Sequence, residues 1–272
     1  MRYRQLTSPI TFGITQGIVG VDGVSSEPVL PITSNLALWM DANDAATFSV
    51  DSYNGEVSSW TDKSSNARVF TPTTVNNFFV RQRKPQWNNR PVVAFSNTAN
   101  FGLACPAYNV QEDFAANGTD ITVFAAVHSD DNILTFGTVY YHLSSGSNGH
   151  YLRLNQTAGN VRFLAVNGST FIAGSNANYI GAPKIISMRR SGNTLQGFVN
   201  GSQQGADVNS TATAATSANA QMFIGTSTVS GGSGLLGDLA ELIIYKRALT
   251  VTERNQVEDY LARKWITGAV VS

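Results

Sequence analysis

Cysteine is almost absent from this sequence: Cys105 is the single one among 272 residues. One cysteine cannot form a disulfide within the chain or supply a cysteine-based metal site. We expect it to be a small buried apolar side chain. Charge is scarce too, because charged residues make up only 13% of the chain, and 18 basic residues balance 18 acidic ones. Such a chain lacks the basic surface of a protein that binds nucleic acid or anionic membranes.

Long apolar runs are also missing. No stretch reaches the ~18 consecutive apolar residues of a transmembrane helix. The opening residues, MRYRQLTSPITFGITQGIV, have neither the continuous apolar core nor the small-residue cleavage site of a secretory signal. We therefore expect a protein that is made in a cytoplasm and kept soluble there until assembly or lysis.

The pattern near the C-terminus predicts a buried strand followed by a helix. Both faces of residues 239–245 are largely apolar, which is typical of a strand inside a sheet. Thr250 and Glu253 have the spacing of a capping box, which starts a helix. The helix then carries an apolar stripe at i, i+4 and i+8 that we expect to be buried: Val257, Leu261 and Trp265.

Short strands separated by turns fill most of the remaining chain. The clearest runs are residues 121–128, 133–137, 139–143, 151–154, 161–166, 184–190, 194–200 and 221–225. Asn-Gly and Ser-Gly pairs between these runs are hairpin signals. Many short strands with one terminal helix predict an all-β fold, an antiparallel β-sandwich of two sheets.

Residues 1–34 differ from the rest and are predicted to form an N-terminal docking arm. Apolar side chains alternate there with glycines and prolines, which discourage a long regular element. The apolar positions of this assembly arm are Ile10, Phe12, Ile14, Ile18 and Val19. A segment this short cannot bury itself, so an apolar strip of this kind marks an interaction site.

Two segments resemble a known family. Residues 237–265, GDLAELIIYKRALTVTERNQVEDYLARKW, resemble the closing strand and helix of the concanavalin A-like, laminin-G-like jelly-roll domains found in bacterial and bacteriophage proteins. The matching positions are Gly237, Ala240, Glu241, Tyr245, Arg247, Leu249, Glu253, Arg254, Val257, Glu258, Tyr260, Leu261, Lys264 and Trp265. Residues 35–66 resemble the opening of the same family, with matches at Trp39, Asp41, Asp44, Trp60, Asp62 and Ser64.

The resemblance implies a concanavalin A-like jelly roll over residues 35–272, with one C-terminal helix. It specifies the fold rather than the activity, because one fold hosts lectins, enzymes, adhesion modules and virion parts. The favoured hypothesis is a non-enzymatic bacteriophage virion protein, a capsid-decorating, tail or fibre subunit. It would contact other virion proteins and copies of itself, and could adhere to host-surface glycans. The alternative is a carbohydrate-binding module or lectin of a bacterial protein.

A glycan-cleaving enzyme is the third and least favoured hypothesis. Glycosidases on this fold usually carry a strand motif of the type E-x-D-x-E, which places a nucleophile and an acid on one face. The sequence has no such motif, and it has no G-x-S-x-G elbow for a hydrolase serine. We predict that the protein is not an enzyme and uses no cofactor.

Metal binding has weak candidates only. Many relatives in the family bind calcium at the edge of the sandwich, and here Asp41, Asn43, Asp44 and Asp62 could supply oxygen ligands. Asx residues at strand ends more often satisfy turn backbone, so no tightly held calcium is expected. The three histidines lack the spacing of a zinc motif and are predicted to be structural; they are His128, His142 and His150.

Four further side chains are candidates for either a binding or a structural role. Trp87, Tyr140 and Tyr141 are candidates for stacking on sugar rings, although aromatic residues are more often part of a core. Glu241 is predicted to be a structural acceptor for backbone groups or for Arg247 or Arg254.

Overall fold

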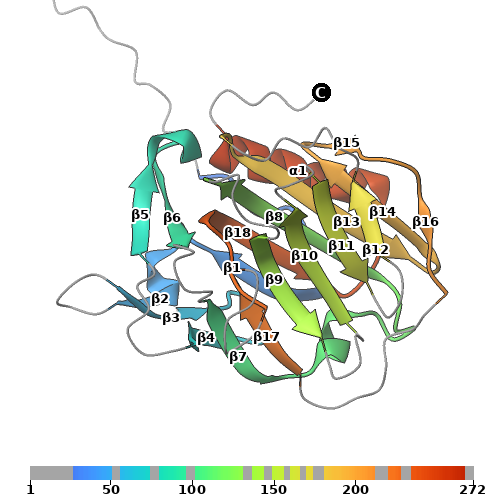
Figure 1. The fold of residues 1–272 in the computed structure, drawn as a ribbon, viewed down its shortest axis with the longest axis horizontal. Helices are drawn as coiled ribbons and strands as arrows, with labels where there is room; N and C mark the ends of the chain where they lie inside the picture. The colour runs from blue at the N-terminus through green and yellow to red at the C-terminus, as the bar shows by residue number, and fades with distance from the viewer. Residues whose placement is uncertain are drawn as a thin grey trace, which may run out of the picture.

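The fold is known from a computed structural model (Figure 1). It describes residues 27–50, 56–73, 80–95, 102–130, 137–143, 149–155, 160–165, 170–173, 181–211, 220–227 and 234–266. The predicted strand at residues 133–137 lies almost entirely outside the described residues.

Two antiparallel sheets form a sandwich, as predicted. The first has the order β15-β14-β13-β8-β18-β6-β5, with β1 also paired to β18 and β16 to β14. Its strands are β1 (Leu36–Asp41), β5 (Val80–Lys84), β6 (Arg90–Phe95), β8 (Ile121–Ser129), β13 (Lys184–Ser191), β14 (Thr194–Val199), β15 (Ser202–Gln203), β16 (Val208–Asn209) and β18 (Gly237–Tyr245).

The second sheet has the order β12-β11-β10-β9-β17-β7-β4-β3-β2. Its strands are β2 (Phe48–Val50), β3 (Val57–Thr61), β4 (Val69–Pro72), β7 (Leu103–Tyr108), β9 (Gly137–Leu143), β10 (Gly149–Asn155), β11 (Asn160–Ala165), β12 (Thr170–Ala173) and β17 (Ala220–Ile224). In the described part of the chain, three short 3-10 helices join strands: η1 (Ala45–Thr47), η2 (Pro85–Trp87) and η4 (Val110–Asp113).

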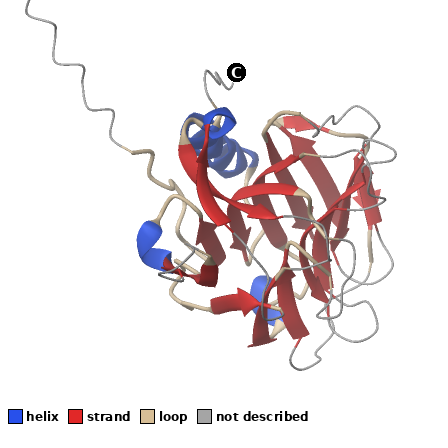
Figure 2. Ribbon diagram, turned by 60° about the vertical axis from the view of Figure 1, so that its left-hand side comes forward, coloured by secondary structure: helices blue, strands red, loops and turns tan. Residues whose placement is uncertain are grey.

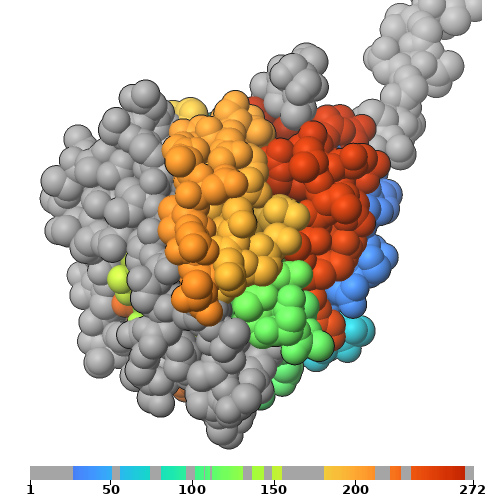
Figure 3. All heavy atoms as spheres, turned by 90° about the vertical axis from the view of Figure 1, so that its right-hand side faces the viewer, coloured from blue at the N-terminus to red at the C-terminus, as the bar shows by residue number. Residues whose placement is uncertain are grey.

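Helix α1 (Val251–Trp265) covers the outer face of the first sheet (Figure 2). Every residue of β8 and β18 is buried, because the second sheet packs on one face and the helix on the other. The predicted capping box forms between Thr250 and Glu253, and the predicted stripe is fully buried. On the surface, α1 lies beside the β14–β16 segment (Figure 3).

Glu241 is the polar centre under this helix. Its carboxylate accepts four hydrogen bonds of 2.6–2.8 Å, from Trp39 Nε1, Tyr260 OH, Lys264 Nζ and Trp265 Nε1. The acceptor role was predicted, but the predicted partners were wrong. Arg247 pairs with Glu253 and Arg254 pairs with Glu258. The carboxylate that pairs with each arginine lies six and four residues further along the chain, respectively, rather than in β18.

The described end of the N-terminal segment packs on the sandwich. Leu30 is buried in the core, and Tyr245 OH donates to the carbonyl of Ile32 over 2.7 Å. Glu27 makes an ion pair with Arg90. Residues 27–34 therefore contact their own jelly roll, while the apolar positions of the predicted docking arm lie outside the described residues.

Candidate functional site

Three adjoining hollows follow strand β1 and form what we call the edge groove. The first, of about 520 Å³, is lined by Asn35, Asn66, Arg68, Glu112, Phe114, Ala115, Ala116, Lys246 and Arg247. The second, of about 410 Å³, shares Asn35 and Lys246 with the first and adds Trp39, Lys63, Ser64 and Ser65. The third, of about 420 Å³, shares Trp39 and Lys63 with the second and reaches Asp41, Asn43 and Asp44.

The loop after β3 builds one wall of the groove by capping the free edge of β1. The carbonyl of Ala37 accepts from Asn66 Nδ2 over 2.9 Å and from Arg68 Nη1 over 2.8 Å. The N–H of Trp39 donates to Asp62 Oδ1 over 2.7 Å. An exposed strand edge invites pairing with another chain, and these side chains block it. The same contacts hold Asn66 and Arg68 in place beside the groove.

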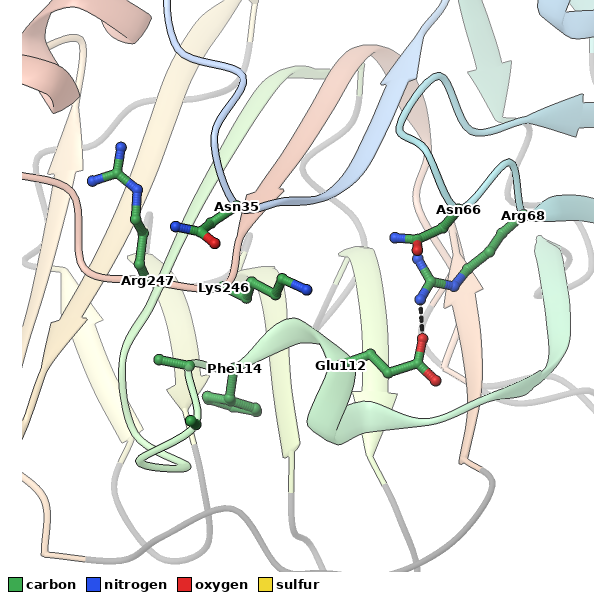
Figure 4. A pocket seen from close by; sticks show the side chains of 9 residues that line it. Asn35, Asn66, Arg68, Glu112, Phe114, Lys246 and Arg247 are labelled. Carbon is green, nitrogen blue, oxygen red and sulfur yellow. Dashed lines mark hydrogen bonds and ion pairs between the residues drawn. The ribbon is translucent and has the colours of Figure 1, made fainter.

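Lys246 is the cation most available to a ligand in the first hollow. Its side chain reaches across the hollow toward Asn66 and Arg68, whereas Arg247 points away (Figure 4). Arg68 is held by an ion pair with Glu112, and Arg247 by one with Glu253. Lys246 is exposed and has no ion-pair partner among the described residues. Amides, an ammonium and a guanidinium thus converge on one hollow.

A buried polar network lies behind η4, the 3-10 helix that carries Glu112. Asp113 Oδ2 is 2.6 Å from His142 Nδ1 and 2.7 Å from His150 Nε2. Tyr108 OH donates to the other carboxylate oxygen, and Tyr140 OH lies 3.0 Å from His150 Nδ1. All five side chains are buried. Because Glu112 and Phe114 flank Asp113, this network fixes the floor of the first hollow.

Burial and hydrogen bonding lower the pKa of Asp113 and His150 and raise that of the two tyrosines. Burial alone would raise the pKa of Asp113, but the two histidines hold it far below its ordinary value. Burial lowers the pKa of His150, against the opposing effect of Asp113. Burial also raises the pKa of Tyr108 and Tyr140 far above their ordinary value. The tyrosines therefore stay protonated and donate.

Lysines neutralise the carboxylates that were weak calcium candidates. Lys63 Nζ lies 3.0 Å from Asp41 and 2.9 Å from Asp44, and Lys264 Nζ lies 2.9 Å from Asp41. Hydrogen bonding to Lys63 lowers the pKa of Asp44, although burial opposes this. A calcium ion here would have to displace ammonium groups.

The other two calcium candidates have structural contacts. The side chain of Asp62 accepts from the Trp39 and Ser64 N–H groups and from Ser64 Oγ. Asn43 lines the third hollow, and its carbonyl accepts from Arg81 Nη2 over 2.9 Å. Asp62 therefore acts in the Asx role that sequence favours for such positions, whereas the cited contact of Asn43 is made by its backbone.

The candidates for sugar stacking divide into buried and half-buried residues. Trp87 and Tyr140 are fully buried, so the expectation that they stack on a ligand is wrong for both. Trp87 packs edge-to-face on Trp265, and the hydroxyl of Tyr140 is hydrogen-bonded to His150 Nδ1. Tyr141 is half-buried and stacks on Tyr151 at 5.8 Å. The half-buried aromatic residue at the groove is Trp39, which was not among the candidates.

The sequence did not predict that His142, His150 and Asp113 meet, because sequence motifs describe only residues at short spacings along the chain. His142 and His150 are directly opposed across the β9–β10 hairpin. They lie one residue outside the Leu143–Gly149 pair, so a hairpin register centred on residue 146 would have indicated a cross-strand pair. No sequence pattern indicated that Asp113 contacts these histidines, because its position depends on the path of η4.

The chain belongs to the concanavalin A-like lectin/glucanases superfamily. The laminin-G-like family model of that superfamily matches residues 108–253, just over half of the 272 residues. This confirms the family and the fold inferred from the two sequence segments. A search of curated protein sequences finds no match.

Solved structures with the same fold are similar to this chain at low sequence identity. A Trypanosoma rangeli sialidase in complex with sialic acid has a TM-score of 0.57 and 14% identity, over 87% of this chain and 35% of the sialidase. Domain 4 of the GH43 extracellular arabinanase from Geobacillus stearothermophilus, in complex with arabinotriose, has a TM-score of 0.56 and 16% identity, over 84% of this chain and 98% of that domain. The binding domain of botulinum neurotoxin serotype D has a TM-score of 0.59 and 10% identity, over 84% of this chain and 52% of that one.

These likenesses define a lectin-type β-sandwich and extend no further than the fold. The chain spans about a third of the length of the sialidases it matches. Within the described residues, no helix is long and apolar enough to cross a membrane.

Proposed function

We propose that this chain is a non-enzymatic carbohydrate-binding protein and that the edge groove is its binding site. The observation that carries the proposal is the lining of the groove. Asn35, Asn66 and Ser65 offer amide and hydroxyl groups, and Lys246 offers an ammonium. Trp39 offers a half-buried aromatic ring, with Lys63 Nζ 4.2 Å from its centroid. Sugar hydroxyls are recognised by such groups, with an aromatic side chain beneath the ring.

The shape of the groove favours an extended ligand over a single sugar. Each hollow has the volume of a small-molecule site, and neighbouring hollows share lining residues. A chain of sugar residues lying along β1 would contact all three. The arabinanase domain with arabinotriose gives a precedent on the same fold for binding an oligosaccharide.

The ion pairs of the carboxylates at the groove support binding without cleavage. Glycoside hydrolysis requires one carboxylic acid with a raised pKa beside a second carboxylate. At the groove, Asp41 and Asp44 are paired with Lys63, and Glu112 is paired with Arg68. The pKa of Asp44 is lowered, mainly by its hydrogen bond to Lys63, which is opposite to the need of a general acid.

For the biological setting, we propose display on a bacteriophage virion. The supporting features are the phage-type sequence resemblance, the 13% charged residues, and the apolar N-terminal positions that suit docking on a neighbouring virion protein or another copy. The protein would be made in the host cytoplasm, and the jelly roll would present its groove to host-surface glycans.

The binding proposal is tested by a glycan array followed by calorimetry on the full chain. Arabinotriose is the first probe, followed by neutral and acidic bacterial-surface oligosaccharides. For an oligosaccharide that binds, Lys246→Ala and Asn35→Ala are expected to weaken affinity about tenfold each, the loss of about one hydrogen bond. The matched control is Arg263→Ala, which removes an exposed cation on α1.

Two results would contradict binding at the edge groove. One is the absence of binding across the array. The other is binding that Lys246→Ala, Asn35→Ala and Arg263→Ala leave equally unchanged, which would place the ligand elsewhere. Release of reducing ends from any bound polysaccharide, abolished by changing one carboxylate, would replace binding by hydrolysis.

A further inference from the structure

A second cluster of potential ligands lies where β8 ends and β18 begins. His128 and Asp238 are direct partners across these antiparallel strands, and Asp130 follows β8 by one residue. Donor atoms of the three side chains lie within 4.8 Å of one another. His128 and Asp238 are buried, while the side chain of Asp130 is 44% exposed. The cluster therefore opens to solvent on one side.

The buried Nδ1 of His128 faces both carboxylates at once. Nδ1 lies 3.1 Å from Asp130 Oδ1 and 3.7 Å from Asp238 Oδ2. Within the described part of the chain these contacts are ion pairs, and their geometry falls short of a hydrogen bond at Nδ1. A buried polar atom that lacks a well-formed hydrogen bond is costly, and such an atom in a native structure needs an explanation.

The distances from His128 Nδ1 to the two carboxylates also fit a shared metal ion. Metal–ligand bonds of about 2.1 Å at tetrahedral angles put neighbouring ligand atoms roughly 3.4 Å apart. The two distances from His128 Nδ1, 3.1 and 3.7 Å, lie on either side of that value. A cation between the three atoms would satisfy Nδ1 and both carboxylates at once.

The Asp113 network shows the contrast. There the two histidine nitrogens both approach one carboxylate oxygen at 2.6–2.7 Å, which is hydrogen-bond spacing. The far nitrogens of His142 and His150 have partners in the Tyr108 carbonyl and Tyr140 OH. That network is complete without a metal, whereas the His128 cluster is not.

Neighbouring groups already hold Asp238 in position. Its Oδ1 accepts from Lys84 Nζ over 2.6 Å, and its Oδ2 accepts from Trp87 Nε1 over 3.0 Å. Outer contacts of this kind orient a ligating carboxylate. The adjacent Gly237, at φ +146°, lets the strands meet closely, since a Cβ there would lie 2.1 Å from the His128 carbonyl oxygen.

We propose that His128, Asp130 and Asp238 bind one divalent transition-metal cation of the zinc class. One imidazole and two carboxylates suit zinc, cobalt, nickel or manganese, and water would complete the coordination on the open side. The two carboxylates carry two negative charges toward the cation, and Lys84 pairs with one of them at Asp238 Oδ1, so among the described residues Asp130 supplies the carboxylate without a lysine partner at this cluster. The proposal does not depend on carbohydrate binding at the edge groove.

The test uses Co²⁺ and Zn²⁺ on the full chain. After treatment with a chelator, the protein is titrated with Co²⁺ and followed by visible absorption, then with Zn²⁺ by calorimetry. We expect one equivalent of each metal and a cobalt absorption band that Zn²⁺ removes. Asp130→Asn, at the exposed position, is expected to weaken binding at least tenfold, and His128→Gln to abolish it. Asp207→Asn, an exposed aspartate on another loop, is the matched control and should bind normally.

Each other result overturns the proposal. Absence of stoichiometric binding shows that His128 is only ion-paired with its two aspartates. Stoichiometric binding that survives both Asp130→Asn and His128→Gln shows that the metal lies elsewhere. If His128→Gln fails to fold, the Asp130→Asn titration alone tests the metal site. The Asp130 side chain is exposed, and its substitution leaves the hydrogen bond from the residue 130 N–H to the Leu236 carbonyl in place.

Discussion

The indole nitrogen of Trp265 donates to Oε2 of Glu241 over 2.6 Å, which ties the end of helix α1 to the middle of strand β18. Lys264 Nζ lies 2.8 Å from the same oxygen. Burial raises the pKa of Glu241, against the lowering effect of Lys264 and the Trp265 N–H. Helix α1 is therefore joined to the sheet by hydrogen bonds to Glu241, which are surrounded by buried apolar side chains.

Replacing Trp265 should separate the contribution of its buried ring from that of its hydrogen bond to Glu241. Trp265→Ala is expected to cost ~3–5 kcal/mol of unfolding free energy, because the ring is fully buried. Trp265→Phe retains most of the ring but loses the N–H donor to Glu241, and should cost about 1.5–3 kcal/mol. Urea titrations of both variants measure the difference. A loss below 1 kcal/mol for the alanine variant would show that the helix contributes little to stability.

The buried His150 should make stability fall on mild acidification. Its pKa is lowered from 6.5 by burial, so the unfolded chain binds a proton more readily than the folded one. Its contribution is complete above pH 6.5 and decreases as the pH falls toward the lowered value. The opposing carboxylate, Asp113, stays ionised there, because its pKa is also lowered.

Melting temperatures between pH 7 and pH 5, with a chelator present, test this prediction. Wild type should lose stability across the window, and His150→Gln should show a flatter dependence at a lower overall stability. Equal slopes for the two proteins would assign the pH dependence to other groups.

Calcium should not stabilise the protein through the Asp41 and Asp44 region. The ammonium groups of Lys63 and Lys264 lie within 3.0 Å of these carboxylates and supply the positive charge there. We expect the melting temperature to change by less than one degree between excess chelator and millimolar calcium. A rise of many degrees on adding calcium, lost in Asp44→Asn, would contradict this, because a ligand that binds the folded state raises stability.

Truncation should separate the docking arm from the part that stabilises the jelly roll. Deleting residues 1–26 is expected to leave the melting temperature unchanged and to abolish assembly with the proposed virion partners. Deleting residues 1–34 should also lower the melting temperature, because it removes buried Leu30 and the Ile32 carbonyl bonded to Tyr245. Light scattering and thermal melts measure both effects. Normal assembly after removal of residues 1–26 would contradict the arm hypothesis.

The sequence by itself determined the sandwich and its terminal helix. Thr250, Glu253 and the stripe ending at Trp265 act within a few residues of one another, so local spacing predicts their geometry. The acceptor role of Glu241 was also predictable, because a carboxylate in a buried strand must be hydrogen-bonded.

Only the tertiary structure decided which side chains meet. Trp39 is 202 residues from Glu241 in sequence, and Asp113 is 29 and 37 residues from its two histidines. Such contacts depend on strand order and on loop paths, which no local period encodes. The same reason explains why Trp87 and Tyr140 are buried: exposure is a property of the packed layers, not of the residue type.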